Sequence, residues 1–204
     1  MTSRLKIAPP TPRGKYREQL LARGLALMYL HGFAATGIQD ITDASGVPKG
    51  SFYNYFKSKD EFGLAALEYY IDIICERLET ILVKGKGSPL ERLRALFAEL
   101  NQELTQKGYV EGCFAGNMCQ ELADVNPAFR PAIECAFQRI QSYFTACLGE
   151  AQQVGELNTK MNAEELGFFL LNSWQGALLR MKASGSDEPL RIFVQVMFEQ
   201  ILRQ

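Results

Sequence analysis

Residues 32–62 read GFAATGIQDITDASGVPKGSFYNYFKSKDEF, and this stretch decides the fold of the first third of the 204-residue chain. Gly46 separates two short segments, 39–45 and 49–56, at a tight turn. A longer segment with apolar residues three and four positions apart precedes them. Three helices with a tight turn between the last two are typical of a helix-turn-helix unit. The sequence therefore predicts a helix-turn-helix at about residues 37–56.

The last of these segments combines an apolar face with a polar one. Phe52 and Phe56, four positions apart, share one face of a helix and can pack against the first helix. The opposite face carries side chains rich in hydrogen-bond donors, namely Lys49, Ser51, Tyr53, Asn54 and Tyr55. Amides and lysines can bind base edges, and hydroxyls and lysines can bind phosphates. This pattern indicates a helix that enters a groove of DNA.

The whole stretch resembles the signature of the TetR family of bacterial repressors. The resemblance implies an all-helical homodimer whose N-terminal domains bind a palindromic operator in double-stranded DNA and whose C-terminal domain binds an inducer. By position in the signature, the DNA contacts would come from Thr36 and Gln39 on the second helix, from Lys49, Gly50, Ser51, Tyr53, Asn54 and Tyr55 on the third, and from Lys59 on a phosphate. Asn54 replaces the histidine or tryptophan often found there, so the operator sequence cannot be inferred. Repression is the expected effect, and activation stays open.

Helical spacing continues to the end of the chain, and no stretch alternates with a period of two over a useful length. The expected fold class is therefore all-α, with about nine helices. Capping-box patterns mark three helix starts, at Ser58 with Glu61, Ser88 with Glu91, and Asn162 with Glu165. The predicted domains are a flexible basic arm (1–14), a DNA-binding domain (15–60), and a regulatory and dimerisation domain (61–204).

The charge of the chain is unevenly distributed. Its formal net charge is −1, but the part through Phe62 carries nine basic and five acidic residues. The remainder is correspondingly acidic, so only the N-terminal part is suited to a polyanion. No run approaches the roughly 18 apolar residues of a membrane helix, and the N-terminus lacks an apolar signal segment. We therefore expect a cytoplasmic protein without a membrane partner.

Two other classes of protein compete with a DNA-binding regulator. An enzyme is not expected, because the single histidine, His31, lies in the DNA-binding segment and no phosphate-binding glycine loop is present. Spaced clusters of cysteine and histidine are also missing, so neither a metal site nor a cofactor is expected. A purely structural helical dimer is the second alternative, and only specific operator binding would separate it from a regulator.

The last two predicted helices are apolar on more than one face, which indicates a second surface to bury. We expect a four-helix dimer interface formed by Leu166, Leu170, Trp174, Met181, Phe193, Met197 and Ile201. Aromatic residues are frequent after Pro89, and some of them could line an apolar pocket. A noncovalent sensor of an apolar, drug-like ligand that controls efflux is therefore an alternative for the regulatory part.

Five cysteines without a C-x-x-C pair fit a reducing compartment. The run Gly112-Cys113-Phe114, with Glu121, Asp124 and Arg130, resembles the NemR-like subgroup of the family, which responds to electrophiles and oxidants. Lys182 falls on the lysine that this resemblance associates with the reactive cysteine, and an ammonium beside a thiol favours the thiolate. Cys113 is thus a candidate sensor or a buried thiol. The remaining cysteines are expected to be small buried hydrophobic residues, namely Cys75, Cys119, Cys135 and Cys147.

Overall fold

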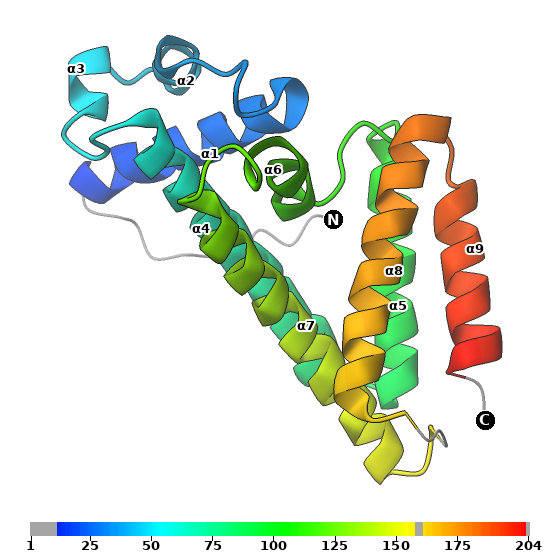
Figure 1. Ribbon diagram of the computed structural model, residues 1–204. Helices are drawn as coiled ribbons and strands as arrows, with labels where there is room; N and C mark the ends of the chain where they lie inside the picture. The colour runs from blue at the N-terminus through cyan, green and yellow to red at the C-terminus, as the bar shows by residue number, and fades with distance from the viewer. Residues whose placement is uncertain (1–11, 158–160, 203–204) are drawn as a thin grey trace. The chain divides into compact units, whose positions relative to one another are not determined.

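The computed structural model describes residues 12–157 and 161–202, and the side chains from residue 16 onward (Figure 1). The chain divides into two compact units, Met1–Ala66 and Leu67–Gln204. We call their described residues the head and the body. Within the described residues the structure has nine α-helices, two short π-helical segments and no strand. The all-α prediction is confirmed. No helix in the described part of the chain is long and apolar enough to cross a membrane.

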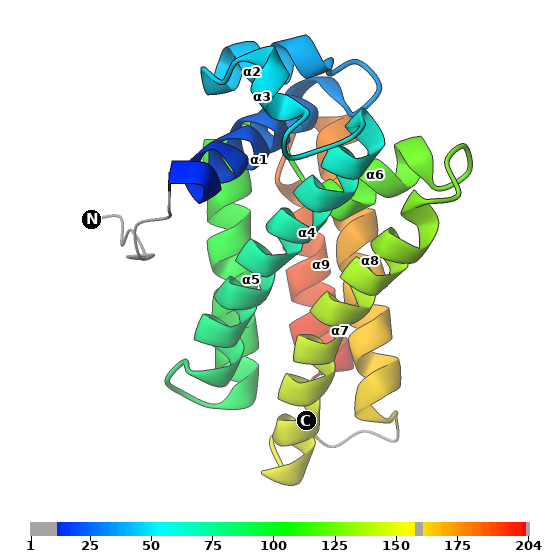
Figure 2. The same cartoon turned by 90° about the vertical axis from the view of Figure 1, so that its left-hand side faces the viewer.

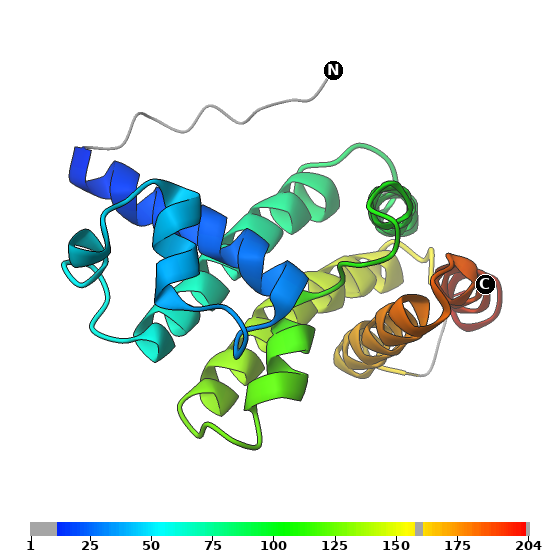
Figure 3. The ribbon, with the colours of Figure 1, turned by 90° about the horizontal axis from the view of Figure 1, so that it is seen from above.

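The head contains α1 (Pro12–His31), α2 (Ile38–Ser45), α3 (Lys49–Phe52) and the first turns of α4 (Lys59–Leu78). Helix α1 packs against α2, as Figure 3 shows from above. The predicted arm, 1–14, overlaps the first three residues of α1, because this helix begins at Pro12. The rest of the arm lies outside the described residues.

Three phenylalanines form the core of the head. The ring centroids of Phe52 and Phe56 lie 5.4 Å apart, and those of Phe56 and Phe62 lie 5.0 Å apart. All three side chains are buried, and Phe62 comes from α4. The predicted apolar face of the segment 49–56 therefore packs inside the head, with the start of α4 as part of the same core.

The turn between α2 and α3 depends on glycine. Gly46 has φ +66° and ψ +22°, a left-handed conformation that glycine adopts without a Cβ penalty. The amide of Gly46 donates to the carbonyl oxygen of Asp43 at 3.3 Å, and the amide of Val47 donates to that of Thr42 at 3.1 Å. These bonds close the C-terminus of α2 and direct the chain into α3.

Helix α3 is shorter than predicted. It was expected to run to Phe56, but regular α-helix ends at Phe52. The amide of Asn54 donates to the carbonyl oxygen of Ser51, and that of Tyr55 to the carbonyl oxygen of Phe52, so these two hydrogen bonds span three residues instead of four. The polar residues that follow α3 are thus carried on tight turns, which the buried rings of Phe52 and Phe56 hold in place.

The body begins with the rest of α4, which continues as the π-helical segment Glu79–Val83. Its other helices are α5 (Pro89–Gln106), α6 (Phe114–Leu122), α7 (Phe129–Gln153), α8 (Ala163–Ser184) and α9 (Glu188–Val196), and α9 continues as the π-helical segment Met197–Ile201. The capping boxes of α5 and α8 form as predicted. Phe97 of α5 lies at the centre of the core, with ring centroids 4.9 Å from Trp174 and 5.0 Å from Phe193.

Ion pairs tie the body part of α4 to its neighbours. Arg139 on α7 contacts Glu68 at 2.6 Å and Asp72 at 2.7 Å, and the two helices run side by side in Figure 2. Further along α4, Arg77 pairs with Glu103 of α5 at 2.7 Å. These pairs join α4 to two different helices, so they fix its direction within the body.

The Arg77–Glu103 pair predicts a pH dependence of stability. Burial opposes ionisation of Glu103, but hydrogen bonds and charges from Lys107 and Arg77 outweigh it and lower the pKa of the carboxyl group. Because the pKa of Glu103 is lower in the folded protein, its ionised form stabilises the fold at pH values above 4.5, the ordinary pKa of this carboxyl group. The stabilisation is lost as the pH falls below 4.5 and through the lowered pKa. Because the side chain of Glu103 is 41% exposed, Glu103→Gln should cost about 1 kcal/mol or less at neutral pH.

Denaturant titrations at several pH values would measure this difference in the free energy of unfolding. Glu76→Gln is the control, because Glu76 is an exposed carboxylate on α4. A deficit of the Glu103 variant that persisted unchanged into acid would contradict the ion-pair explanation.

Candidate nucleic-acid interface and thiol site

The polar residues predicted to contact DNA are mostly on the surface of the head. Gln39, Lys49, Gly50, Tyr53 and Asn54 are exposed, and Ser51 and Tyr55 are half-buried. The amide nitrogen of the Gln39 side chain donates to Asp43 at 2.7 Å, so it is held along α2. Lys49, Tyr53 and Asn54 project from the short α3 and the turns after it. The structure thus places donors and a positive charge on one short segment of the head.

Thr36 differs from its predicted position. It was expected on the second helix facing DNA, but it lies before α2 and is buried, with 1% of its surface exposed. Its hydroxyl donates to the carbonyl oxygen of Gly32 at 2.7 Å. A hydroxyl used in this way closes the turn after α1, so Thr36 supports the loop instead of presenting a group to a groove.

Lys59 is also engaged inside the head. Its ammonium donates to the carbonyl oxygen of Ala34 at 3.0 Å and lies 4.6 Å from the ring centroid of Phe33. Arg17 of α1 lies over the ring of Phe56 at 5.5 Å. Both cations rest on aromatic residues of the head, and Lys59 fastens the start of α4 to the turn that precedes α2.

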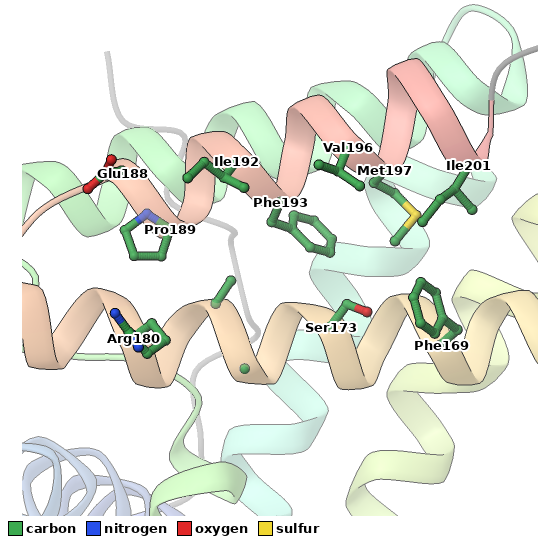
Figure 4. A pocket seen from close by; sticks show the side chains of 12 residues that line it. Phe169, Ser173, Arg180, Glu188, Pro189, Ile192, Phe193, Val196, Met197 and Ile201 are labelled. Atoms are coloured by element: carbon green, nitrogen blue, oxygen red, sulfur yellow. The ribbon is translucent and has the colours of Figure 1, made fainter.

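The predicted dimer residues require a correction. Leu166, Leu170, Trp174 and Met181 are buried in the core of the body, so they do not lie on the surface of the single chain. Phe193 and Met197 are buried as well, but they line a groove of about 560 Å³ between α8 and α9, together with the half-buried Ile201. Figure 4 shows this groove, with Phe169 of α8 on one side and Ile192 and Val196 of α9 on the other. The side chains of Phe169, Ile192 and Val196 are exposed there.

The sequence contained a signal for this second face. Outside the main apolar stripes of α8 and α9 lie three further apolar residues, Phe169, Ile192 and Val196. A helix with two apolar faces can pack one of them in the core and leaves the other on the surface. The strongest stripe, which was expected at a dimer interface, packs inside the body instead. The weaker stripe is the exposed one.

Cys113 lies at the N-terminus of α6 and is buried, with 7% of its surface exposed. Its Sγ accepts a hydrogen bond from the Tyr70 hydroxyl at 3.6 Å. A small cavity of about 20 Å³ reaches it, lined also by Asn117, Gln175 and Lys182. The ammonium of Lys182 donates to the side-chain oxygen of Asn117 at 3.0 Å. The structure therefore brings Lys182 to the same cavity as Cys113, as the sequence resemblance implied.

The other four cysteines lie elsewhere in the body. Burial raises the pKa of the Cys75 and Cys119 thiols, and it raises that of Cys147 to about 11. Thiols with raised pKa values are poor nucleophiles at neutral pH. Cys135 was expected to be buried but is exposed, because the neighbouring Ile133 and Ala136 direct the apolar face of α7 inward. Cys119 is only partly buried.

Known proteins resemble both parts of the chain. Residues 20–66 match the family described as "Bacterial regulatory proteins, tetR family", and residues 89–197 match "Tetracyclin repressor-like, C-terminal domain". The transcriptional repressor DhaR of Mycobacterium sp. (strain GP1) is 34% identical over 190 residues, covering 93% of this chain and 94% of that protein. The transcriptional repressor NemR of Escherichia coli (strain K12) is 31% identical over 174 residues, covering 85% and 87%.

A solved structure agrees with the sequence relatives. The reduced form of Escherichia coli NemR matches with a TM-score of 0.83 and 30% identity, covering 88% of this chain and 93% of that one. Fold, helix-turn-helix and relatives point to transcriptional regulation through DNA, and not to an enzyme family. The chain is a member of the TetR family of DNA-binding transcriptional repressors.

Proposed function

We propose that the protein binds a palindromic operator as a homodimer and represses transcription until an inducer releases it. The observation that carries the operator proposal is the exposed set Lys49, Tyr53 and Asn54 on a segment held by a buried aromatic core. Such a segment can enter a major groove without reorganising, and a dimer presents two of them to successive turns of DNA.

Two substitutions separate base contacts from phosphate contacts. Asn54→Ala should weaken operator binding by about fivefold to a hundredfold and leave binding to random DNA unchanged, because an exposed amide can pair with adenine. Lys49→Ala should weaken binding to both DNAs and lower the slope of log affinity against log salt by about one.

Fluorescence anisotropy on an operator from the promoter of the protein's own gene and on random DNA, at several salt concentrations, would measure both effects. Asn172→Ala, which removes an exposed amide from α8, is the control. If Asn54→Ala weakens binding to the operator and to random DNA equally, base recognition by Asn54 is contradicted. If the unaltered protein binds both DNAs with equal affinity, the operator proposal is contradicted.

The groove between α8 and α9 supports the homodimer. Phe169, Ile192 and Val196 expose apolar surface there, and Phe193 and Met197 form its base. Two copies that meet through the same patch bury it on both sides, as a twofold interface requires. Arg180 and Glu188 line the same groove and supply opposite charges for the rim.

We further propose that Cys113 responds to electrophiles or oxidants and that Lys182 assists it. The support is the resemblance of its surroundings to the NemR-like subgroup, together with the cavity that Cys113 and Lys182 share. Cys113→Ser should bind the operator as the parent protein does and should not be released by thiol reagents.

The reagent for this test is methyl methanethiosulfonate, applied to a Cys135→Ser parent so that the exposed thiol does not react. Residue-resolved mass spectrometry would report which thiol is modified, and anisotropy would report release. Release of the Cys113→Ser variant at the parent's reagent concentration would contradict the sensor role and favour a noncovalent ligand.

A further inference from the structure

The thiol of Cys113 is in contact with α4, the helix that links the two units. Tyr70 lies on α4 and is buried, and its hydroxyl donates to Cys113 Sγ at 3.6 Å. The Tyr70 ring also meets the ring of Phe114, the residue after Cys113, with centroids 5.6 Å apart and planes at 61°. One residue of α4 therefore contacts both the candidate sensor and the first residue of α6.

Little free space surrounds this contact. The cavity beside Cys113 has a volume of about 20 Å³, which is enough for about one water molecule. Its walls include Gly112, Leu178 and Lys182, and a Cβ on Gly112 would be in ordinary contact with Cδ of Lys182, at 3.5 Å. Because the Tyr70 hydroxyl contacts the sulfur directly, a group added to Sγ competes with this hydroxyl for the space around the sulfur.

The start of α4 is fixed in the head. Phe62 is fully buried there, and the ammonium of Lys59 donates to Ala34. Helix α4 is continuous from Lys59 to Leu78, so Tyr70 follows Phe62 by about two helical turns. A displacement at Tyr70 thus acts on the helix whose first turns belong to the core of the head.

We propose that Tyr70 is the positioning residue that converts a change at the Cys113 sulfur into a movement of α4. This inference rests on the sensor role proposed for Cys113. In the unmodified protein the hydroxyl rests against Sγ and α4 holds the operator-binding state. An adduct on Sγ takes the place of the hydroxyl, and Tyr70 and α4 move together. The substitution Tyr70→Phe removes only the hydroxyl, so it frees the space of about one oxygen atom and breaks the contact with Cys113 Sγ.

The test uses the Cys135→Ser parent and methyl methanethiosulfonate. The Cys113 sulfur attacks the thiomethyl sulfur of the reagent, the S–S bond of the reagent breaks, and methanesulfinate leaves with the bonding electrons. The thiol proton passes to solvent, and Cys113 keeps an S-methylthio group. Mass spectrometry verifies complete modification before operator affinity is measured by anisotropy.

We expect modification to weaken operator binding of the parent by about tenfold or more, a usual size of allosteric coupling. In Tyr70→Phe the same modification should change the affinity by about threefold or less. Tyr69→Phe is the matched control: it removes a hydroxyl from the same helix, about 100° around its axis. This control should respond as the parent does.

A second pair of variants needs no reagent. Cys113→Met adds two non-hydrogen atoms at the same position, so it should weaken operator binding by about tenfold, and adding Tyr70→Phe should restore most of it. A folding defect of either single variant would not be repaired by adding the second substitution, so restored operator binding in the double variant indicates coupling between positions 70 and 113.

The two proposals fail in different ways. The role of Tyr70 would be overturned if the Tyr70→Phe protein with fully modified Cys113 releases the operator as the parent does, and if Tyr70→Phe does not restore operator binding to Cys113→Met. The sensor role of Cys113 would then remain. A parent protein that keeps its operator affinity after complete modification of Cys113 would overturn the sensor role, and the role of Tyr70 with it.

Discussion

Replacing Ile192 with aspartate is expected to separate the proposed dimer and to weaken operator binding by about a hundredfold or more. Ile192 is 51% exposed on the wall of the α8–α9 groove, so a charge there is tolerated in a single chain. In a twofold interface two such charges would be buried close together without partners, which is costly. A monomer then binds one half-site and loses the gain that comes from holding both half-sites at once.

Analytical ultracentrifugation would give the oligomeric state, and anisotropy the operator affinity. Val125→Asp is the matched control, because Val125 is an exposed apolar residue of the turn after α6 and does not line the groove. Circular dichroism checks that both variants keep their helices. An Ile192→Asp protein that stays dimeric would show that the interface lies elsewhere.

Gly167→Ala is expected to destabilise the body by about 1–3 kcal/mol, the range of an overpacked core. A Cβ at Gly167 of α8 would lie 3.0 Å from the backbone nitrogen and 3.2 Å from Cα of Thr145 on α7, and it would collide with the Thr145 hydroxyl. Backbone atoms cannot move aside as a flexible side chain does, so the two helices would have to separate.

Gly149→Ala provides a control on the same pair of helices. A Cβ there meets only Cβ of Ala163 at 3.6 Å, which is an ordinary contact. Because alanine favours helix over glycine, this variant should gain about 0.5–1 kcal/mol. Denaturant unfolding of both variants at one protein concentration would measure the difference. Equal stabilities would contradict the close crossing of α7 and α8 at Gly167.

Local features of the fold could be predicted from the sequence. The turn at Gly46 and the capping boxes at Ser88 and Asn162 depend on residues within a few positions of each other, and each formed as expected. The predicted end of α3 was wrong. Phe52 and Phe56 keep a helical spacing and are joined by a hydrogen bond, but the amides of Asn54 and Tyr55 between them bond over three residues, and the sequence pattern does not show this change.

Long-range features could not be predicted in the same way. Periodicity shows that α8 and α9 have apolar faces, but it does not say which face meets the core of the body. Leu170 and Trp174 lie in that core and not on the surface as expected. Tyr70 and Cys113 are 43 positions apart, and no spacing rule joins them. Lys182 was placed near Cys113 only by family resemblance, and the shared cavity supports it.

The short α3 has a consequence for how operator preference can change over evolutionary time. The segment keeps its shape through Phe52, Phe56 and the glycine turn, while Lys49 and Asn54 are exposed and have no place in the packed core. Substitutions at these two positions should therefore cost little folding stability. If the proposed operator contacts hold, a descendant of this protein can acquire a different DNA preference by changing exposed side chains alone, without loss of the fold.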